Sequence, residues 1–340
     1  MGTPYAVSSD LVSAWPAKSL AVATYLDGAL AAKWTSKVSD TAPATPAEGD
    51  VWVDTTGATT IAKMWNGTAW VSFSGARATV SGTTGSPTIT SAGGKTYYTF
   101  TGDGTITVTD GFAGVYLLAG GGSGARITTG GAGGGGGGGL LQTASALLTT
   151  GTHAIKVGAG AAGTSTDSTS GAQGGFSRLG PYASVGGGGG DITGTAQTGG
   201  CGGGAYGSST TNNTGGPALQ NFAGGDSFSS ATQTLRGGGG GGGTGAVGGN
   251  AASDTGGAGG AGISVTGFDS TGAAVQKGGG GGGSSPGADT GGAGGAGGGT
   301  KGVYTGASAS AAANTGGGSG GSSGSASGNG GSGIVIVVIG

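Results

Sequence analysis

The sequence predicts a mostly β protein with a bundle of polyglycine II helices, a short N-terminal α-helix and a small β-hairpin module. Three observations support this fold class. Glycine supplies 95 of the 340 residues, whereas charged residues supply only 8%. Short strand-like runs of apolar residues separate pure glycine runs. The glycine-rich segments also carry a period of three residues, which is the period of polyglycine II.

Residues 1–40 are predicted to form a helical segment that attaches and oligomerises the chain. Between Pro16 and Trp34, apolar residues recur at four-residue spacing, at Val22, Leu26, Leu30 and Trp34. A narrow apolar stripe on a short helix cannot bury itself alone. The stripe therefore packs either on the next module or on copies of itself, and both interpretations stay open.

Residues 41–78 are predicted to form a small β-hairpin module that begins with a proline-containing linker. Its strands are expected at residues 51–54, 59–65 and 69–73. Asn66-Gly67 is a favoured two-residue turn between the last two strands. The tryptophans of these strands, Trp52, Trp65 and Trp70, suggest either a sugar-stacking cluster or the core of the module. We favour the core, because so small a module has little else to bury.

Residues 79–340 are predicted to form a glycine-rich domain that combines β-strands with polyglycine II rods. Strands are expected at residues 96–100, 105–109, 115–118, 152–157 and 334–339. Alternation places Ile106 and Val108 on one face of their strand, and it places His153 on the same face as Ile155. The unbroken apolar run at 334–339 predicts burial on both faces.

Pure glycine runs occupy residues 133–139, 186–190, 237–243 and 278–283. Helices and sheets both disfavour such runs. Polyglycine II remains, a left-handed helix with three residues per turn and no internal hydrogen bonds. Each buried N–H and C=O group of a run must therefore pair with a neighbouring segment. The runs are expected to pack side by side as rods.

A nine-residue block, Asp-Thr-Gly-Gly-Ala-Gly-Gly-Ala-Gly, occurs at residues 254–262 and again at 289–297. In a three-fold helix, both alanines of a block lie on one edge, and the two glycine edges allow close approach by other backbones. A basic residue, Arg236 or Lys277, precedes the glycine run ahead of each block. This internal repeat predicts constant rods joined by variable connectors.

Four features of residues 95–340 resemble a known family. They are the strand at 115–118 that enters a glycine block, the segment His-Ala-Ile-Lys-Val-Gly-Ala-Gly at 153–160, the serial glycine runs, and the ending at 330–337. Together they resemble the glycine-rich domain of phage tail proteins, including the adhesins that cap the long tail fibres of some T-even-like phages. The resemblance implies a rigid bundle of polyglycine rods that holds receptor-binding loops.

The segments at 39–43, 49–54 and 64–71 are in turn similar to phage tail-fibre modules. The combined resemblance implies a virion protein, a tail fibre or minor tail protein, made in the host cytoplasm. Fibre components of this type are usually trimers, which implies a homotrimer with other virion proteins as partners. The alternative is a purely structural head fibre, capsid decoration or tail spacer without receptor binding. A glycine-rich antifreeze protein is a third class, but no flat threonine-rich face is evident.

Charge and residue supply argue against several other functions. The formal net charge of -2 gives no electrostatic footprint for nucleic acid or an anionic membrane. The longest aliphatic stretch, at 334–339, is far too short for membrane insertion. Cys201 and His153 are the only cysteine and histidine, so neither a disulfide framework nor a Cys/His zinc site is expected.

Catalysis and a cofactor are likewise not expected. A Ser-His-Asp mechanism would have to use His153, and strand alternation places that side chain beside Ile155, which favours a satisfied and partly buried histidine. Acidic residues are isolated in turn-like sequence. Cys201, between glycines, is expected to fill a small gap between rods rather than to act as a reactive thiol.

Recognition is expected in the connector from Tyr206 to Phe228. Its candidate receptor-binding residues are Tyr206, Asn212, Asn213, Phe222 and Phe228. Aromatic rings beside amides suit cell-surface sugars, because rings stack on sugars and amides meet hydroxyls. A rigid scaffold that presents a variable loop is a common arrangement for binding, and the expected partner is host cell-surface carbohydrate or protein. In the alternative interpretation, these aromatic side chains only fix the loop onto the bundle.

Overall fold

The computed structural model describes residues 38–47, 50–56, 61–65, 67–72, 77–109, 111–266, 271, 273–287 and 290–340. The helix expected between Pro16 and Trp34 lies outside these residues. The chain divides into two compact units, Met1–Ala76 and Arg77–Gly340. The described residues are mostly β, which confirms the coarse fold class, and their one helical element is the 3-10 helix η1 (Gln233–Leu235). No helix among them is long and apolar enough to cross a membrane.

In the first unit, the described residues form a four-stranded sheet in the order β1 (Val38–Ser39), β2 (Val51–Asp54), β3 (Ile61–Trp65) and β4 (Trp70–Ser72). Trp65 lies opposite Trp70, so the connection spans residues 66–69, and the two-residue turn expected at Asn66-Gly67 is wrong. This register brings the two indole rings edge to face at 5.6 Å between centroids. Such a contact adds about 0.5–1.5 kcal/mol, whereas a two-residue turn would place Thr68 opposite Trp65.

Trp52 is the core of this small sheet. It is buried, packs edge to face with Trp70 at 5.6 Å, and donates its indole N–H to the carbonyl of Ser39 at 3.1 Å. The ammonium of Lys63 lies 4.8 Å from the centroid of the same indole. The rings of Trp65 and Trp70 are half-buried and lie at a steep angle to each other. The core interpretation therefore holds for Trp52, and the three rings do not make a flat stacking platform.

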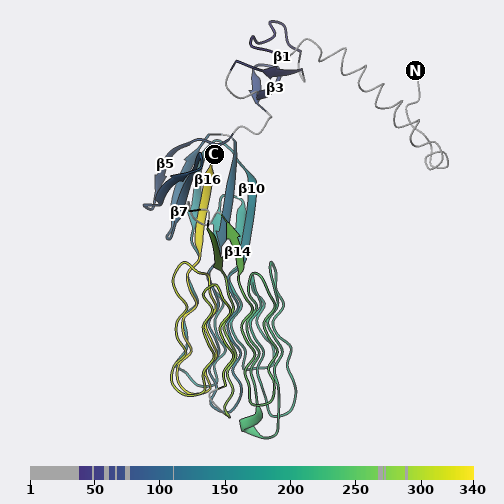
Figure 1. Cartoon of the computed structure of the whole chain (residues 1–340), viewed down its shortest axis with the longest axis vertical. Coiled ribbons are helices and arrows are strands. Elements are labelled where there is room, and N and C mark those ends of the chain that lie inside the picture. The colour runs from purple at the N-terminus through teal and green to yellow at the C-terminus, as the bar shows by residue number, and fades with distance from the viewer. Residues whose placement is uncertain are drawn as a thin grey trace, which may run out of the picture. The chain divides into compact units, whose positions relative to one another are not determined.

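The strands of the second unit form two five-stranded antiparallel sheets and a separate hairpin (Figure 1). Sheet I has the order β10 (Leu140–Leu148), β9 (Gly111–Leu118), β16 (Ile334–Ile339), β7 (Lys95–Phe100) and β6 (Thr88–Ala92). Sheet II has the order β13 (Tyr182–Ser184), β12 (Ser177–Leu179), β11 (Gly151–Lys156), β8 (Gly104–Val108) and β5 (Val80–Thr84). A separate hairpin pairs β14 (Ile263–Thr266) with β15 (Ala274–Lys277).

The two sheets pack face to face around one apolar core. Phe100, Leu117 and Val337 of sheet I meet Ile106 and Leu179 of sheet II, and all five are buried. The predicted inward face of β8 is thus confirmed. The β14–β15 hairpin covers the other face of sheet I, where its buried Val265 packs with Ile336 and Val338. The last strand, β16, is therefore buried on both faces, as its apolar run predicts.

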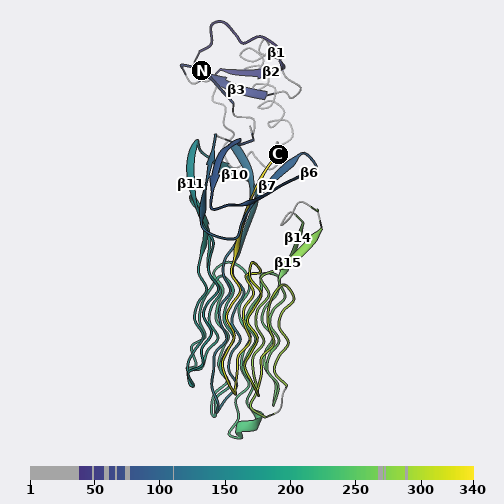
Figure 2. The ribbon, with the colours of Figure 1, turned by 90° about the vertical axis from the view of Figure 1, so that its left-hand side faces the viewer.

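The rest of the second unit forms extended segments that run alternately away from and toward the sheets (Figures 1 and 2). Successive backbone N–H groups of the run 133–139 donate in turn to three neighbouring segments. Residues 133, 136 and 139 donate to the segment 185–191. Residues 134 and 137 donate to 239–242, and residues 135 and 138 donate to 316–319. The run 237–243 repeats this pattern with three other segments. Residues 238 and 241 donate to 281–284, residues 239 and 242 donate to 202–205, and residues 240 and 243 donate to 246–249. Every third residue thus returns to the same neighbour.

Glycine is required where the segments approach each other this closely. The four pure glycine runs are fully buried, and a Cβ on any residue of 133–139 would lie under 3.0 Å from another segment. The outer segments differ. Gly256, Gly259 and Gly262 of the first nine-residue block donate to Thr290, Ala293 and Ala296 of the second, while the alanines of both blocks face outward, exposed or half-exposed. The predicted alanine edge therefore lies on the surface of the bundle.

Candidate recognition surface

The turns farthest from the sheets form a surface that we call the free end, where η1 lies (Figure 1). It comprises residues 128–131, 164–169, 192–195, 207–213, 228–236, 252–255, 304–307 and 323–325. Serine and threonine dominate these turns, with asparagine and glutamine among them, whereas the segments between them are mostly glycine. The free end is therefore much richer in serine and threonine than the glycine segments that lead to it.

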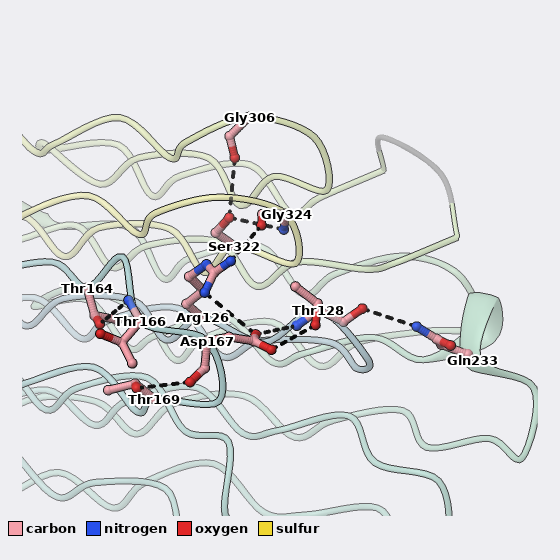
Figure 3. Close-up of polar contacts among 10 residues, drawn as sticks. All are labelled: Arg126, Thr128, Thr164, Thr166, Asp167, Thr169, Gln233, Gly306, Ser322 and Gly324. Atoms are coloured by element: carbon pink, nitrogen blue, oxygen red, sulfur yellow. Dashed lines mark hydrogen bonds and ion pairs between the residues drawn. The ribbon is translucent and has the colours of Figure 1, made fainter.

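One polar cluster ties four of these turns together (Figure 3). The Asp167 carboxylate accepts hydrogen bonds from the backbone N–H and the hydroxyl of Thr128, both at 2.9 Å. Gln233 donates to the carbonyl of Thr128 at 3.1 Å. Arg126 donates from Nη2 to the carbonyl of Gly324 at 3.1 Å. Each bond crosses between segments far apart in sequence, so the cluster fixes the turns relative to one another.

Arg126 and Asp167 carry opposite charges at the centre of this cluster. Arg126 Nη1 lies 3.8 Å from Asp167 Oδ1, and their side chains are 15% and 44% exposed. Burial, the largest influence on its pKa, raises the pKa of Asp167, but hydrogen bonds from Thr128 and Ser168 and the charge of Arg126 outweigh it and lower the pKa below its usual value. Asp167 is therefore ionised at neutral pH.

Three of the five predicted recognition residues, Asn212, Asn213 and Phe228, lie in two adjacent turns of the free end, and Tyr206 directly precedes the first of these turns. Asn212 accepts a hydrogen bond from the N–H of Ser229 at 2.7 Å, and Asn213 donates to the carbonyl of Tyr206 at 2.6 Å. Phe228 exchanges two backbone hydrogen bonds of 2.9 Å with Gly237. The two asparagine side chains therefore hold these turns in shape.

Phe222 does not belong to that group. The preceding turn is bound to the sheet end of the bundle, because Asn221 accepts from the N–H of Leu140 at 2.8 Å and Gln220 accepts from the N–H of Val185 at 2.6 Å. The interpretation of 206–228 as one connector is thus wrong. Two hydrogen-bonded segments interrupt it, through bonds such as Gly216 to Gly203 and Gly225 to Gly240, both 2.7 Å. Low glycine content at 217–223 concealed this return to the sheets.

The Tyr206 ring packs into a small apolar cluster with Ile127 and Ile192 beneath the free end. Burial raises the pKa of its phenol, and the positive charge of Arg236 offsets part of that rise. Arg236 in turn donates from Nε to the carbonyl of Ser230 at 2.9 Å and from Nη1 to the carbonyl of Thr129. This packing supports the interpretation that Tyr206 fixes its turn onto the bundle.

His153 and Cys201 have the structural environments that the sequence predicts. His153 is half-buried on the face of Ile155, and its Nε2 lies 2.8 Å from the carbonyl oxygen of Thr149. Cys201 is fully buried between glycine segments, and burial raises the pKa of its thiol to about 12. The described residues contain no group of three or more His, Cys, Asp or Glu that could hold a metal ion.

Sequence reasoning missed Arg126 and Asp167. A usable signal was present, since charged residues are rare in this chain and Asp167 stands in the glycine-free stretch Thr-Ser-Thr-Asp-Ser-Thr. That stretch has the composition of a surface turn. Its partner could not be named, because 41 residues (167 minus 126) separate the two.

Comparison with known proteins places the chain in a family. A family model described as a glycine-rich domain matches residues 99–340. The chain belongs to this glycine-rich domain family. The matched region contains most of both sheets and every segment of the bundle. No curated protein matches the chain.

Proposed function

We propose that this glycine-rich protein is a bacteriophage tail fibre or minor tail protein that binds the host cell surface through the free end of its bundle. One observation carries the proposal: serine and threonine dominate the turns at one end of the bundle, whereas the segments between these turns are mostly glycine. Such a scaffold suits the presentation of recognition turns at a distance from an anchor.

The segments of the bundle are proposed to be polyglycine II helices. The rotation of hydrogen bonds among three neighbours, with a return at every third residue, supports three residues per turn. At about 3.1 Å per residue, a seven-residue run would extend for about 22 Å. Side-by-side hydrogen bonding of such rods would make the bundle stiff, which suits a particle protein that must hold its recognition turns in place.

Residues 1 to about 75 are proposed to join three copies and attach them to the virion. The support is the amphipathic stripe in the sequence and the tryptophan-rich first unit. A chain of residues 77–340 is then expected to be monomeric in sedimentation, while the full chain is trimeric. If residues 77–340 formed the same oligomer as the full chain, the assembly role of the N-terminal region would be wrong.

Host binding is tested with fluorescently labelled full-length protein and a panel of intact bacteria. We expect it to bind selected strains and to compete with adsorption of the phage that carries it. The triple variant Tyr206→Ala, Asn212→Ala, Asn213→Ala should lose binding. Phe222→Ala is the matched control, because Phe222 is 40% exposed at the other end of the bundle. Absence of binding to every strain that the phage infects would contradict the proposal and favour a purely structural role.

The structural alternative is a head fibre, capsid decoration or tail spacer. It is distinguished by labelling intact particles with antibodies against residues 77–340. A label at the distal tip of the tail supports adhesion, whereas a label distributed over the capsid supports decoration.

A further inference from the structure

The Arg126 guanidinium retains unused hydrogen-bond donors at the free end. It carries five N–H groups, and among the described residues one of them has a hydrogen-bond partner, the carbonyl of Gly324. Its Nε is buried without a partner. The 3.8 Å separation of Nη1 from Asp167 Oδ1 exceeds a hydrogen bond. The two charged groups therefore attract each other, but no hydrogen bond joins Nη1 to Oδ1.

The gap between Nη1 and Oδ1 fits one particular kind of group. Because the two atoms are 3.8 Å apart, one oxygen can lie at a hydrogen-bond distance of about 2.9 Å from both Nη1 and Oδ1. That oxygen has to accept from the guanidinium and donate to the carboxylate, which a hydroxyl does at once. A carboxylate or phosphate ligand would instead face the ionised Asp167, and an ammonium ligand would face Arg126. The two opposite charges therefore favour a neutral ligand with hydroxyl groups over an anionic or a cationic ligand.

The surroundings of Asp167 are built to hold its carboxylate in place. Ser168 has a φ of 55°, a left-handed conformation that is strained in a residue other than glycine. Its backbone N–H donates to Asp167, and Thr128 donates twice more. Ser165, Thr166 and Ser168, which flank Asp167 in the sequence, are exposed. These hydroxyls provide further donors and acceptors for a ligand with several hydroxyl groups.

We infer that the Arg126–Asp167 pair is a binding site for neutral sugars, which it recognises through adjacent ring hydroxyls. The first hydroxyl bridges Nη1 and Oδ1, and the neighbouring hydroxyls of the sugar meet the serine- and threonine-rich turn 164–169 that carries Asp167. The inference rests on the proposed function, because it names the ligand class of the same free end. It places the contact on a different pair of turns from Tyr206 and Asn213.

Saturation-transfer NMR on the full-length protein tests this site. The probes are the methyl glycosides of glucose, galactose and mannose, with glucuronate and glucosamine as anionic and cationic comparators. We expect transfer to at least one neutral glycoside and weaker transfer to both charged sugars. Arg126→Met and Asp167→Asn should each weaken binding about tenfold, as loss of a charged hydrogen-bond partner predicts.

The matched control is Asp103→Asn. It removes a carboxylate from the exposed Lys156–Asp103 pair, 3.6 Å apart. Lys156 belongs to β11 of sheet II and Asp103 directly precedes β8, so the substitution should leave sugar binding unchanged. Circular dichroism identifies any variant that fails to fold, in which case Arg126→Lys, which keeps the charge but loses the planar fork, replaces Arg126→Met. No transfer to any neutral glycoside, or equal transfer in both folded variants, overturns the inference.

Cell binding separates this inference from the proposed function. If the labelled protein binds host cells and both variants bind equally well, the sugar site is wrong and adhesion through other turns stands. If the protein contacts neutral glycosides but binds no host strain, the sugar site stands and the adhesive function is wrong.

Discussion

At the scale of single residues, burial controls the chemistry of Cys201. The thiol is fully buried, and burial raises its pKa to about 12, so almost no thiolate forms at pH 8. We therefore expect no reaction of the native protein with Ellman's reagent at pH 8 and one reactive thiol per chain in guanidinium chloride. Rapid labelling of the native protein would show that the glycine segments around Cys201 open readily.

Asp54 gives the first unit a predictable response to acid. Lys63 donates to its carboxylate at 2.7 Å, and this bond, with others from Thr56, lowers the pKa of Asp54 from 3.8 to about 2. A lowered folded pKa stabilises the unit above pH 4, and that contribution is lost as the pH falls toward 2. All five tryptophans lie in residues 1–76. Tryptophan fluorescence should thus report loss of stability over this range, and Asp54→Asn should remove that dependence on pH.

Individual residues also show how far the sequence determines the candidate site. Aromatic and amide residues in a glycine-poor stretch identified Tyr206, Asn212 and Asn213, which the structure places together. The pairing of Arg126 with Asp167 depends on which segments lie side by side in the bundle. Backbone hydrogen bonds between glycines set that arrangement, and glycines are identical in sequence. Composition therefore locates turns, but it does not pair them.

At the scale of elements, each glycine segment depends on the absence of side chains. Gly135→Ala should lower the free energy of unfolding by about 1–3 kcal/mol or more, because the new Cβ would overlap the backbone of Gly122 and Ser123. Gly82→Ala is the matched control: Gly82 is exposed in β5 with nothing within 4 Å of its Cβ position. Chemical denaturation measures both variants. Equal stabilities would contradict close packing of the run 133–139.

The strands were predicted best where apolar residues alternate or run together, as in β8 and β16. β10 was missed, because a bulge between Thr143 and Ala146 breaks its alternation. β12 and β13 have three residues each. Their pairing comes from the sheet around them, and no periodicity is detectable over so short a length.

At the scale of the whole molecule, β16 joins parts of the second unit that are distant in sequence. Ile336 is fully buried between β7 and β9 and packs under the β14–β15 hairpin. Ile336→Ala should lower the free energy of unfolding by about 2–5 kcal/mol, as removal of a buried aliphatic side chain does. Ile89→Ala on β6, where Ile89 is 53% exposed, should change it far less. Similar losses in thermal unfolding would show that sheet I does not form the core described.

The position of β16 also fixes when sheet I can be completed. Val335 lies opposite Phe100, 235 residues earlier (335 minus 100). At 5–20 residues per second, a ribosome needs roughly 10–50 seconds to make the intervening chain. During that time the inner edges of β7 and β9 have no shared partner, and unpaired strand edges recruit other chains. The yield of folded protein should therefore depend on how quickly translation proceeds and on how crowded the nascent chains are.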